Sequence, residues 1–130
     1  MNIFKTSLLF LATLFVVAKV EAYTHNFRNN SGRRINIRAK YTACNPSDFD
    51  LEHGQGHSEG VGLCALEGVI IREGGRGGSI IYDNISSNSP DKGKGPYSAA
   101  GSREWEIISL PPQKLPNGMI IRKIEVRKIS

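Results

Sequence analysis

The feature that most constrains the fold is an alternation of apolar and polar residues, with a period of two, along residues 34–41. The odd positions, among them Ile35, Ile37 and Tyr41, are apolar or aromatic, and the even positions are mostly polar. Successive side chains of a β-strand point to opposite faces. The pattern therefore predicts a strand with one face in the core and the other in solvent.

Further strands are predicted along the rest of the chain. The alternation returns briefly in residues 104–107, where Trp105 and Ile107 share one phase. Residues 63–72 and 79–84 are apolar more continuously, which is typical of central strands covered on both faces. All of these segments favour a β-protein.

The last predicted strand, residues 119–129, carries a conflict of phase. Ile124 and Val126 lie in one phase and Ile121 in the other, so we expect a β-bulge near residues 122–123 to reconcile them. The core residues predicted from these patterns are Ile35, Ile37, Tyr41, Trp105, Ile107, Ile124 and Val126.

The connections between these segments are rich in turn-forming residues. The chain has 14 glycines and 6 prolines, and no helical periodicity beyond its first residues. Residues 73–78 are predicted as a hairpin loop, residues 86–101 as a long loop, and residues 111–118 as a rigid connector into the last strand. We predict an all-β fold, a single antiparallel β-sandwich of about six or seven strands with one disulfide, the alternative being a small open β-barrel.

Residues 1–22 have the pattern of a cleaved secretory signal peptide. Lys5 lies in a short polar start, residues 8–17 are apolar or small, and Ala22 provides a small residue for cleavage. No second apolar stretch follows that could anchor the chain after cleavage. We expect residues 23–130 to form one domain in a secreted, periplasmic or other extracytoplasmic location.

The two cysteines, Cys44 and Cys64, both follow the predicted leader. An exported chain meets an oxidising compartment, so these two residues are predicted to form a disulfide. Closing a loop of this length stabilises a fold by about 3 kcal/mol in the chain-entropy model.

Basic residues exceed acidic ones, with 17 Lys and Arg against 12 Asp and Glu and a formal net charge of +5. Arg34, Arg38 and Lys40 alternate along one strand, so they form a candidate site for anionic partners. They would extend into a longer basic stripe if the terminal strand lay beside them. The alternative is that glutamates on neighbouring strands neutralise them as cross-strand pairs. The candidate glutamates are Glu104, Glu106 and Glu125.

Residues 48–59 resemble metal-binding patterns in their spacing. Carboxylates at the first, third, fifth and twelfth positions match an EF-hand calcium loop, but His53 stands where that loop needs glycine. His53 and His57, four residues apart, suggest zinc only if the segment is helical, which Gly54 disfavours. The candidate metal ligands, with calcium the favoured ion, are Asp48, Asp50, Glu52, His53, His57 and Glu59.

Residues 56–60 match the Gly-x-Ser-x-Gly pattern of a hydrolase nucleophile, with Ser58 at its centre. That chemistry needs a strand before the serine, a helix after it, and a histidine downstream. All three histidines precede Ser58, so we interpret the segment as a polar loop. Asn29 and Asn84 are in potential N-glycosylation sequons.

These observations predict a secreted, non-catalytic binding protein without a cofactor. Its expected partner is an extracellular protein, a glycan or an anionic surface rather than nucleic acid. One alternative is a small hydrolase or metal-dependent enzyme that uses residues 48–59. The other is an effector or inhibitor that inserts residues 86–101 into a target.

Overall fold

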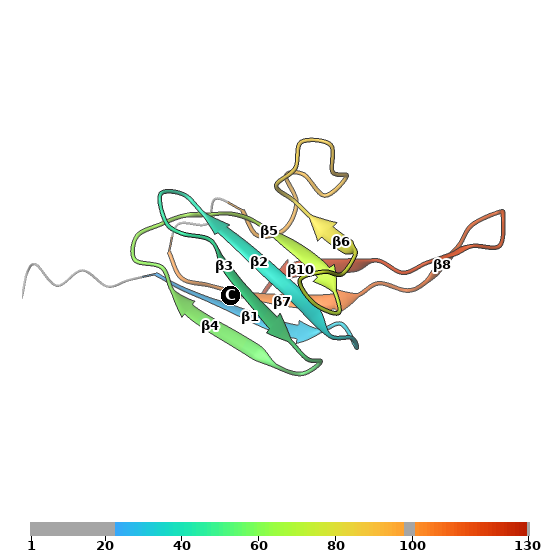
Figure 1. The fold of residues 1–130 in the computed structure, drawn as a ribbon, viewed down its shortest axis with the longest axis horizontal. Coiled ribbons are helices and arrows are strands. Elements are labelled where there is room, and N and C mark those ends of the chain that lie inside the picture. Colours follow the sequence, from blue (N-terminus) through green and yellow to red (C-terminus); the bar gives the residue numbers. More distant parts are fainter. Residues whose placement is uncertain (1–22, 98–100, 130) are drawn as a thin grey trace, which may run out of the picture.

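The computed structural model describes residues 23–97 and 101–129, which fold as two β-sheets packed face to face (Figure 1). The predicted leader, residues 1–22, lies outside the described residues. The first sheet has the strand order β10-β7-β1-β4 and the second the order β3-β2-β5-β6. Their bounds are β1 Thr24–Asn30, β2 Ile35–Tyr41, β3 Ser47–Leu51, β4 Gly56–Gly60, β5 Leu66–Glu73, β6 Ile80–Asp83, β7 Arg103–Ser109 and β10 Ile124–Lys128. The all-β class and the open sandwich are confirmed.

One strand pair differs from the purely antiparallel arrangement that the sequence predicted. β1 pairs with β7 in parallel, with His25 opposite Arg103 and Phe27 opposite Trp105. The other pairs within both sheets are antiparallel. A parallel pair needs a long crossover, and here the chain builds the whole second sheet between β1 and β7.

The core lies between the two sheets and matches the period-two patterns. Each of the seven predicted core residues is at most 6 % exposed, and Ile35, Ile37 and Ile107 are fully buried. Phe27 and Leu66 complete the same cluster. Cys44 and Cys64, whose Cα atoms lie 6.1 Å apart, form the predicted disulfide at its margin.

The predicted central position holds for β5 but not for β6. β5 lies between β2 and β6, while β6 is an edge strand whose Ile80 is 52 % exposed. Residues 73–78 form the predicted hairpin loop between them. The apolar residues of 79–84 therefore do not form the central strand, covered on both faces, that their pattern predicted.

Residues 119–129 do not form one bulged strand. They divide into β9, Ile120–Ile121, and β10, with residues 122–123 outside both. β9 pairs with β8, Gln113–Lys114, in a separate two-stranded sheet, whereas β10 pairs with β7. The conflict of phase arises because the two halves serve different sheets.

Residues 48–59 are not an exposed loop. They contain β3 and β4, which are edge strands of opposite sheets, and the chain crosses between them at residues 52–55. The seam between these two edges closes one side of the sandwich. Among the described residues, no helix is long and apolar enough to span a membrane.

Candidate functional site

The hairpin of residues 110–123 projects from the sandwich, and we refer to it as the arm (Figure 1). Its strands pair Gln113 with Ile121 and Lys114 with Ile120. The backbone N–H of Leu110 donates to the carbonyl of Lys123 at 2.8 Å, at the base. The predicted rigid connector, residues 111–118, is thus the first half of a projecting hairpin.

The arm ends in a tight turn whose backbone groups bond one another. The N–H of Gly118 donates to the carbonyl of Leu115 at 2.9 Å, and the N–H of Leu115 donates to the carbonyl of Met119 at 2.7 Å. The Oδ1 of Asn117 accepts from the N–H of Met119 at 3.0 Å. Gly118 has φ +87°, a conformation that glycine adopts without steric cost. Pro116 presets the first corner of the turn.

Three apolar side chains of the arm are exposed, whereas Leu115 and Ile121 are half-buried. Met119 is 58 % exposed, Ile120 is 59 % exposed, and Leu110 at the base is 36 % exposed. No residue of the arm is buried. An isolated two-stranded hairpin is marginal in water, and exposed apolar clusters commonly mark interaction sites.

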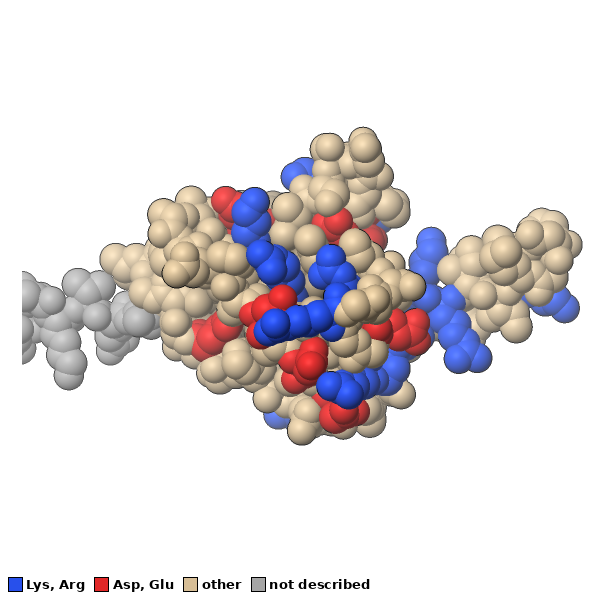
Figure 2. All heavy atoms as spheres, viewed as in Figure 1, with Lys and Arg blue, Asp and Glu red and all other residues tan. Residues whose placement is uncertain are grey.

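The arm is also basic throughout. Residues 110–123 contain Lys114, Arg122 and Lys123 and no Asp or Glu. Within residues 23–97 and 101–129, no carboxylate lies within ion-pair distance of these three cations. Figure 2 shows the projecting knob with blue atoms at its neck and near its end, and with no red atoms in this view.

The sequence predicts no projecting arm here, although it contains a signal for one. Three apolar residues, 119–121, follow a Pro-Asn-Gly turn, and basic residues bracket the whole segment. A strand that is apolar at three consecutive positions does not fit a sandwich with one wet face. The same run fits a hairpin that carries an apolar residue on each of its two faces.

The predicted anion-binding residues lie on the outer face of β2, and carboxylates of this face accompany each of them. β2 and β10 belong to different sheets, so no joint basic stripe forms with the terminal strand. The glutamate prediction holds in one case, because Glu106 forms a cross-strand pair with Arg127 of the terminal strand, but the predicted anion-binding cations pair with other carboxylates. We call this outer surface of β2, with the carboxylates beside it, the polar face. Its ion pairs join Arg34 to Asp50 and to Glu52, both at 3.3 Å, Arg38 to Asp48 at 3.6 Å, and Lys40 to Glu67 at 3.5 Å.

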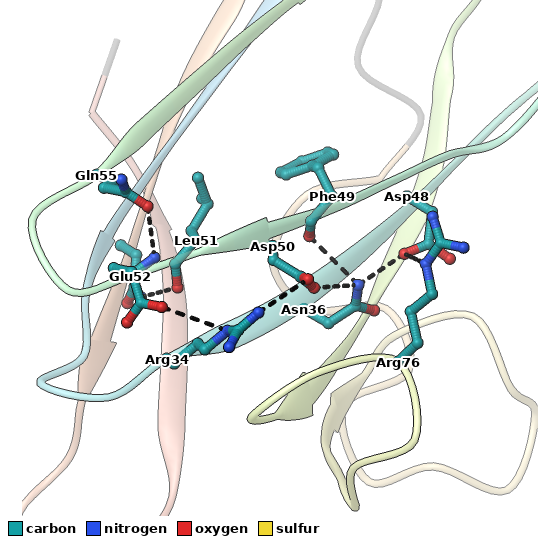
Figure 3. Close-up of polar contacts among 10 residues, drawn as sticks. Arg34, Asn36, Asp48, Phe49, Asp50, Leu51, Glu52, Gln55 and Arg76 are labelled. Carbon is teal, nitrogen blue, oxygen red and sulfur yellow. Dashed lines mark hydrogen bonds and ion pairs between the residues drawn. The ribbon is translucent and has the colours of Figure 1, made fainter.

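Asn36 lies at the centre of the polar face and is fully buried beneath it (Figure 3). Its Nδ2 donates to Asp48 Oδ1 at 2.7 Å and to Asp50 Oδ1 at 2.8 Å. The hydrogen bond from Asn36 lowers the pKa of Asp50, opposed by desolvation and assisted by Arg34. The Asn36 amide thus positions two carboxylates by hydrogen bonds, and those carboxylates form ion pairs with Arg34 and Arg38.

The candidate metal ligands do not converge. Asp48 and Asp50 bond Asn36, and Glu52 pairs with Arg34. His53 is on the connection between the sheets, where its Nδ1 accepts from a backbone N–H at 2.9 Å. Within the part of the chain that the structure describes, no three His, Cys, Asp or Glu side chains form a group that could hold a metal ion.

His57 and Glu59 lie in the seam between β3 and β4, and Glu59 is the centre of a polar cluster there. Its Oε1 accepts from the hydroxyls of Tyr41 and Ser47, the latter at 2.7 Å. Its Oε2 lies 3.2 Å from His57 Nε2, and the His57 ring stacks on Phe49 at 3.9 Å between centroids. Burial and the hydrogen bond to Glu59 raise the pKa of Tyr41, so its hydroxyl stays a donor.

His25 lies behind this cluster, fully buried, with its ring 5.8 Å from that of Tyr41. Among the residues that the structure describes, neither of its ring nitrogens finds a hydrogen-bond partner. Desolvation by burial lowers the pKa of His25, the charge of Glu59 raises it, and Arg103 lowers it. The imidazole is therefore held neutral in the core.

A carboxylate beside a histidine is two thirds of a hydrolytic triad, but neither serine nearby completes it. Ser47 donates to Glu59 itself rather than to His57. Ser58 alternates with both residues along β4, so it points to the outer face of the first sheet. The segment around Ser58 is a strand rather than the polar loop expected.

The two sequons do not present free side chains. Asn29 is fully buried, and its Nδ2 donates to two backbone carbonyls at 2.7 and 3.0 Å. Asn84 is 2 % exposed, and its Nδ2 likewise donates to two carbonyls, at 2.7 and 2.8 Å. A glycan on either nitrogen does not fit this fold.

The chain was compared with protein-family models, with curated proteins and with solved structures, and none of them matches it.

Proposed function

We propose that the protein is a secreted, non-catalytic binding protein that engages its partner through the arm. The observation that carries this proposal is the arm's composition: exposed apolar side chains and three cations in one hairpin that stands clear of the core. Contact with a partner would cover apolar surface that the fold leaves in water.

The extracytoplasmic location rests on two supports. Residues 1–22 have the pattern of a secretory leader. Cys44 and Cys64 form a disulfide, which is consistent with an oxidising compartment.

The proposal that the protein is not an enzyme is supported by the seam cluster. His57 and Glu59 are in contact, but the hydroxyls nearest to them either bond the carboxylate or lie on the opposite face. A nucleophile must lie within hydrogen-bond reach of its base. The cluster provides hydrogen-bond partners for its own polar groups and does not align a nucleophile with a base.

The charge of the arm favours an anionic partner among the three classes expected from the sequence. Three cations that have no carboxylate within ion-pair distance among the described residues attract polyanions, whereas the cations of the polar face already have counter-charges. The loop of residues 86–101, considered earlier as an inserting segment, carries mixed charge. The arm therefore replaces it as the candidate contact.

The test places an environment-sensitive fluorophore at the tip, through Asn117→Cys in the protein with its disulfide intact. The probes are heparin and anionic lipid vesicles. We expect at least one of them to change the emission, and the triple change Lys114→Gln, Arg122→Gln, Lys123→Gln to abolish that response without lowering the melting temperature.

The matched control is the triple change Arg34→Gln, Arg38→Gln, Lys40→Gln, which removes the same charge from the polar face. We expect this control to keep the fluorescence response. Loss of binding in the control with retention in the arm variant would overturn the proposal and restore the polar face as the binding site.

A further inference from the structure

The apolar side chains of the arm are not confined to one of its faces. Ile120 and Ile121 are adjacent in β9, so they project to opposite faces, and Leu115 and Met119 extend the apolar surface toward the tip. A hairpin that lies on a flat protein surface needs only one apolar face. Ile120 and Ile121 place one apolar side chain on each face, beside Lys114 and Gln113 of the partner strand, which fits an environment that contacts both faces.

Arg122 and Lys123 lie behind the apolar end of the arm, whereas Lys114 is level with Ile120 across the hairpin and has a long side chain that can extend back toward the headgroups. Arg122 is four residues beyond Gly118, roughly 13 Å along an extended strand. The apolar face of an interfacial element enters a bilayer by about 5–10 Å, with cations at the level of the headgroups. Arg122 and Lys123 thus stand at the height of lipid phosphates when the tip reaches the acyl chains.

Most of the backbone donors at the tip already have acceptors. The N–H groups of Leu115, Gly118 and Met119 bond within the turn, Pro116 has no N–H, and among the described residues only the N–H of Asn117 at the tip has no acceptor. Unsatisfied backbone groups are what make irregular segments costly in hydrocarbon. A glycan partner, by contrast, would need several polar side chains at the tip, where residues 115–119 supply only that of Asn117.

We propose that the partner of the arm is an anionic lipid bilayer, into whose surface the tip inserts while Lys114, Arg122 and Lys123 contact headgroup phosphates. This inference rests on the proposed function and names the partner of the same arm. It commits to a lipid surface rather than to an anionic glycan, because apolar side chains occupy the end of the arm.

The test measures binding of the wild type to vesicles of phosphatidylcholine with roughly 30 % phosphatidylserine, to vesicles of phosphatidylcholine alone, and to heparin. We expect binding to the anionic vesicles that weakens with salt. The change Met119→Ser with Ile120→Ser should lower this affinity at least about tenfold and leave heparin unaffected. Removing the three cations should lower it roughly a hundredfold at low salt.

The matched control is Leu63→Ser with Ile80→Ser, which removes two apolar side chains of similar exposure outside the arm. It should keep vesicle affinity. Quenching of a fluorophore at Asn117→Cys by brominated acyl chains reports whether the tip enters hydrocarbon, and we expect quenching.

Three results would overturn the inference, and they differ in whether the proposed function of the arm survives. Binding to heparin without binding to vesicles overturns the bilayer but leaves the arm as a binding element. Vesicle binding that depends on the cations, with no effect of the tip change and no quenching, reduces the contact to surface charge and also overturns insertion. Failure to bind either probe removes both the inference and the proposed function.

Discussion

The polar face and the arm each carry three cations that the sequence makes conspicuous, yet the structure treats them differently. Arg34, Arg38 and Lys40 lie beside carboxylates of neighbouring strands and turns, and Asn36 fixes two of those carboxylates from below (Figure 3). The arm supplies no counter-charge of its own. A count of basic residues therefore says little about binding until the acidic residues beside them are known.

The largest expected difference concerns Asn36. Asn36→Ala removes hydrogen bonds to two carboxylates from a fully buried position, so we expect a loss of about 2–4 kcal/mol in the free energy of unfolding. Gln113→Ala in the arm is the matched control and should stay within about 0.5 kcal/mol. Urea unfolding measures both. Equal effects of the two changes would mean that the polar face is no more organised than the arm.

A second difference concerns pH. His25 has a lowered pKa in the folded state, so the unfolded chain binds more protons as pH falls below 6.5. The contribution of His25 to the free energy of unfolding is therefore fully present above pH 6.5, and it is lost as the pH falls toward the lowered pKa of the folded state. The arm, residues 110–123, contains no histidine.

The variant His25→Phe keeps an aromatic ring beside Tyr41 and removes the titrating group. We expect its melting temperature to depend less on pH between about 5 and 7 than that of the wild type. Glu59 and Arg103 face the same site and remain in the variant as charged groups. An identical pH profile in both proteins would exclude His25 as the source.

The smallest expected difference concerns single surface charges. Arg34→Gln should cost about 0.2–1 kcal/mol, because it loses two exposed ion pairs, and the cost should shrink in high salt. Lys123→Gln has no ion pair to lose and should leave the free energy of unfolding unchanged, while it weakens vesicle binding. A larger loss of stability for Lys123→Gln would show that the base of the arm supports the sandwich.

The sequence predicted those parts of the fold in which the buried side chains are apolar and the exposed ones are polar. Ile35, Ile37 and Tyr41 point into the core as their alternation indicates. The strand Thr24–Asn30 was missed, because His25 and Asn29 occupy inward positions where an apolar residue would be expected. Hydrogen bonds satisfy Asn29 in the core, and a linear pattern cannot reveal such partners.

The candidate site was harder to predict, because its character depends on distances between strands. The acidic residues of 48–59 suggested a metal loop, but β3 and β4 separate them onto different sheets and bring Asp48 and Asp50 beside Asn36. The arm was predicted as a connector, because proline and glycine mark turns but do not state how far a turn stands from the core.

The parallel pairing of β1 with β7 has a consequence for how the chain acquires its fold. β1 is an inner strand of the first sheet, between β4 and β7, and the latter begins at Arg103. A chain that emerges from its N-terminal end therefore leaves β1 without this neighbour until nearly all of its residues are present. Such distant pairing is associated with slow folding. The first sheet is therefore completed only when β7 and β10, the last two of its strands along the chain, become available for pairing.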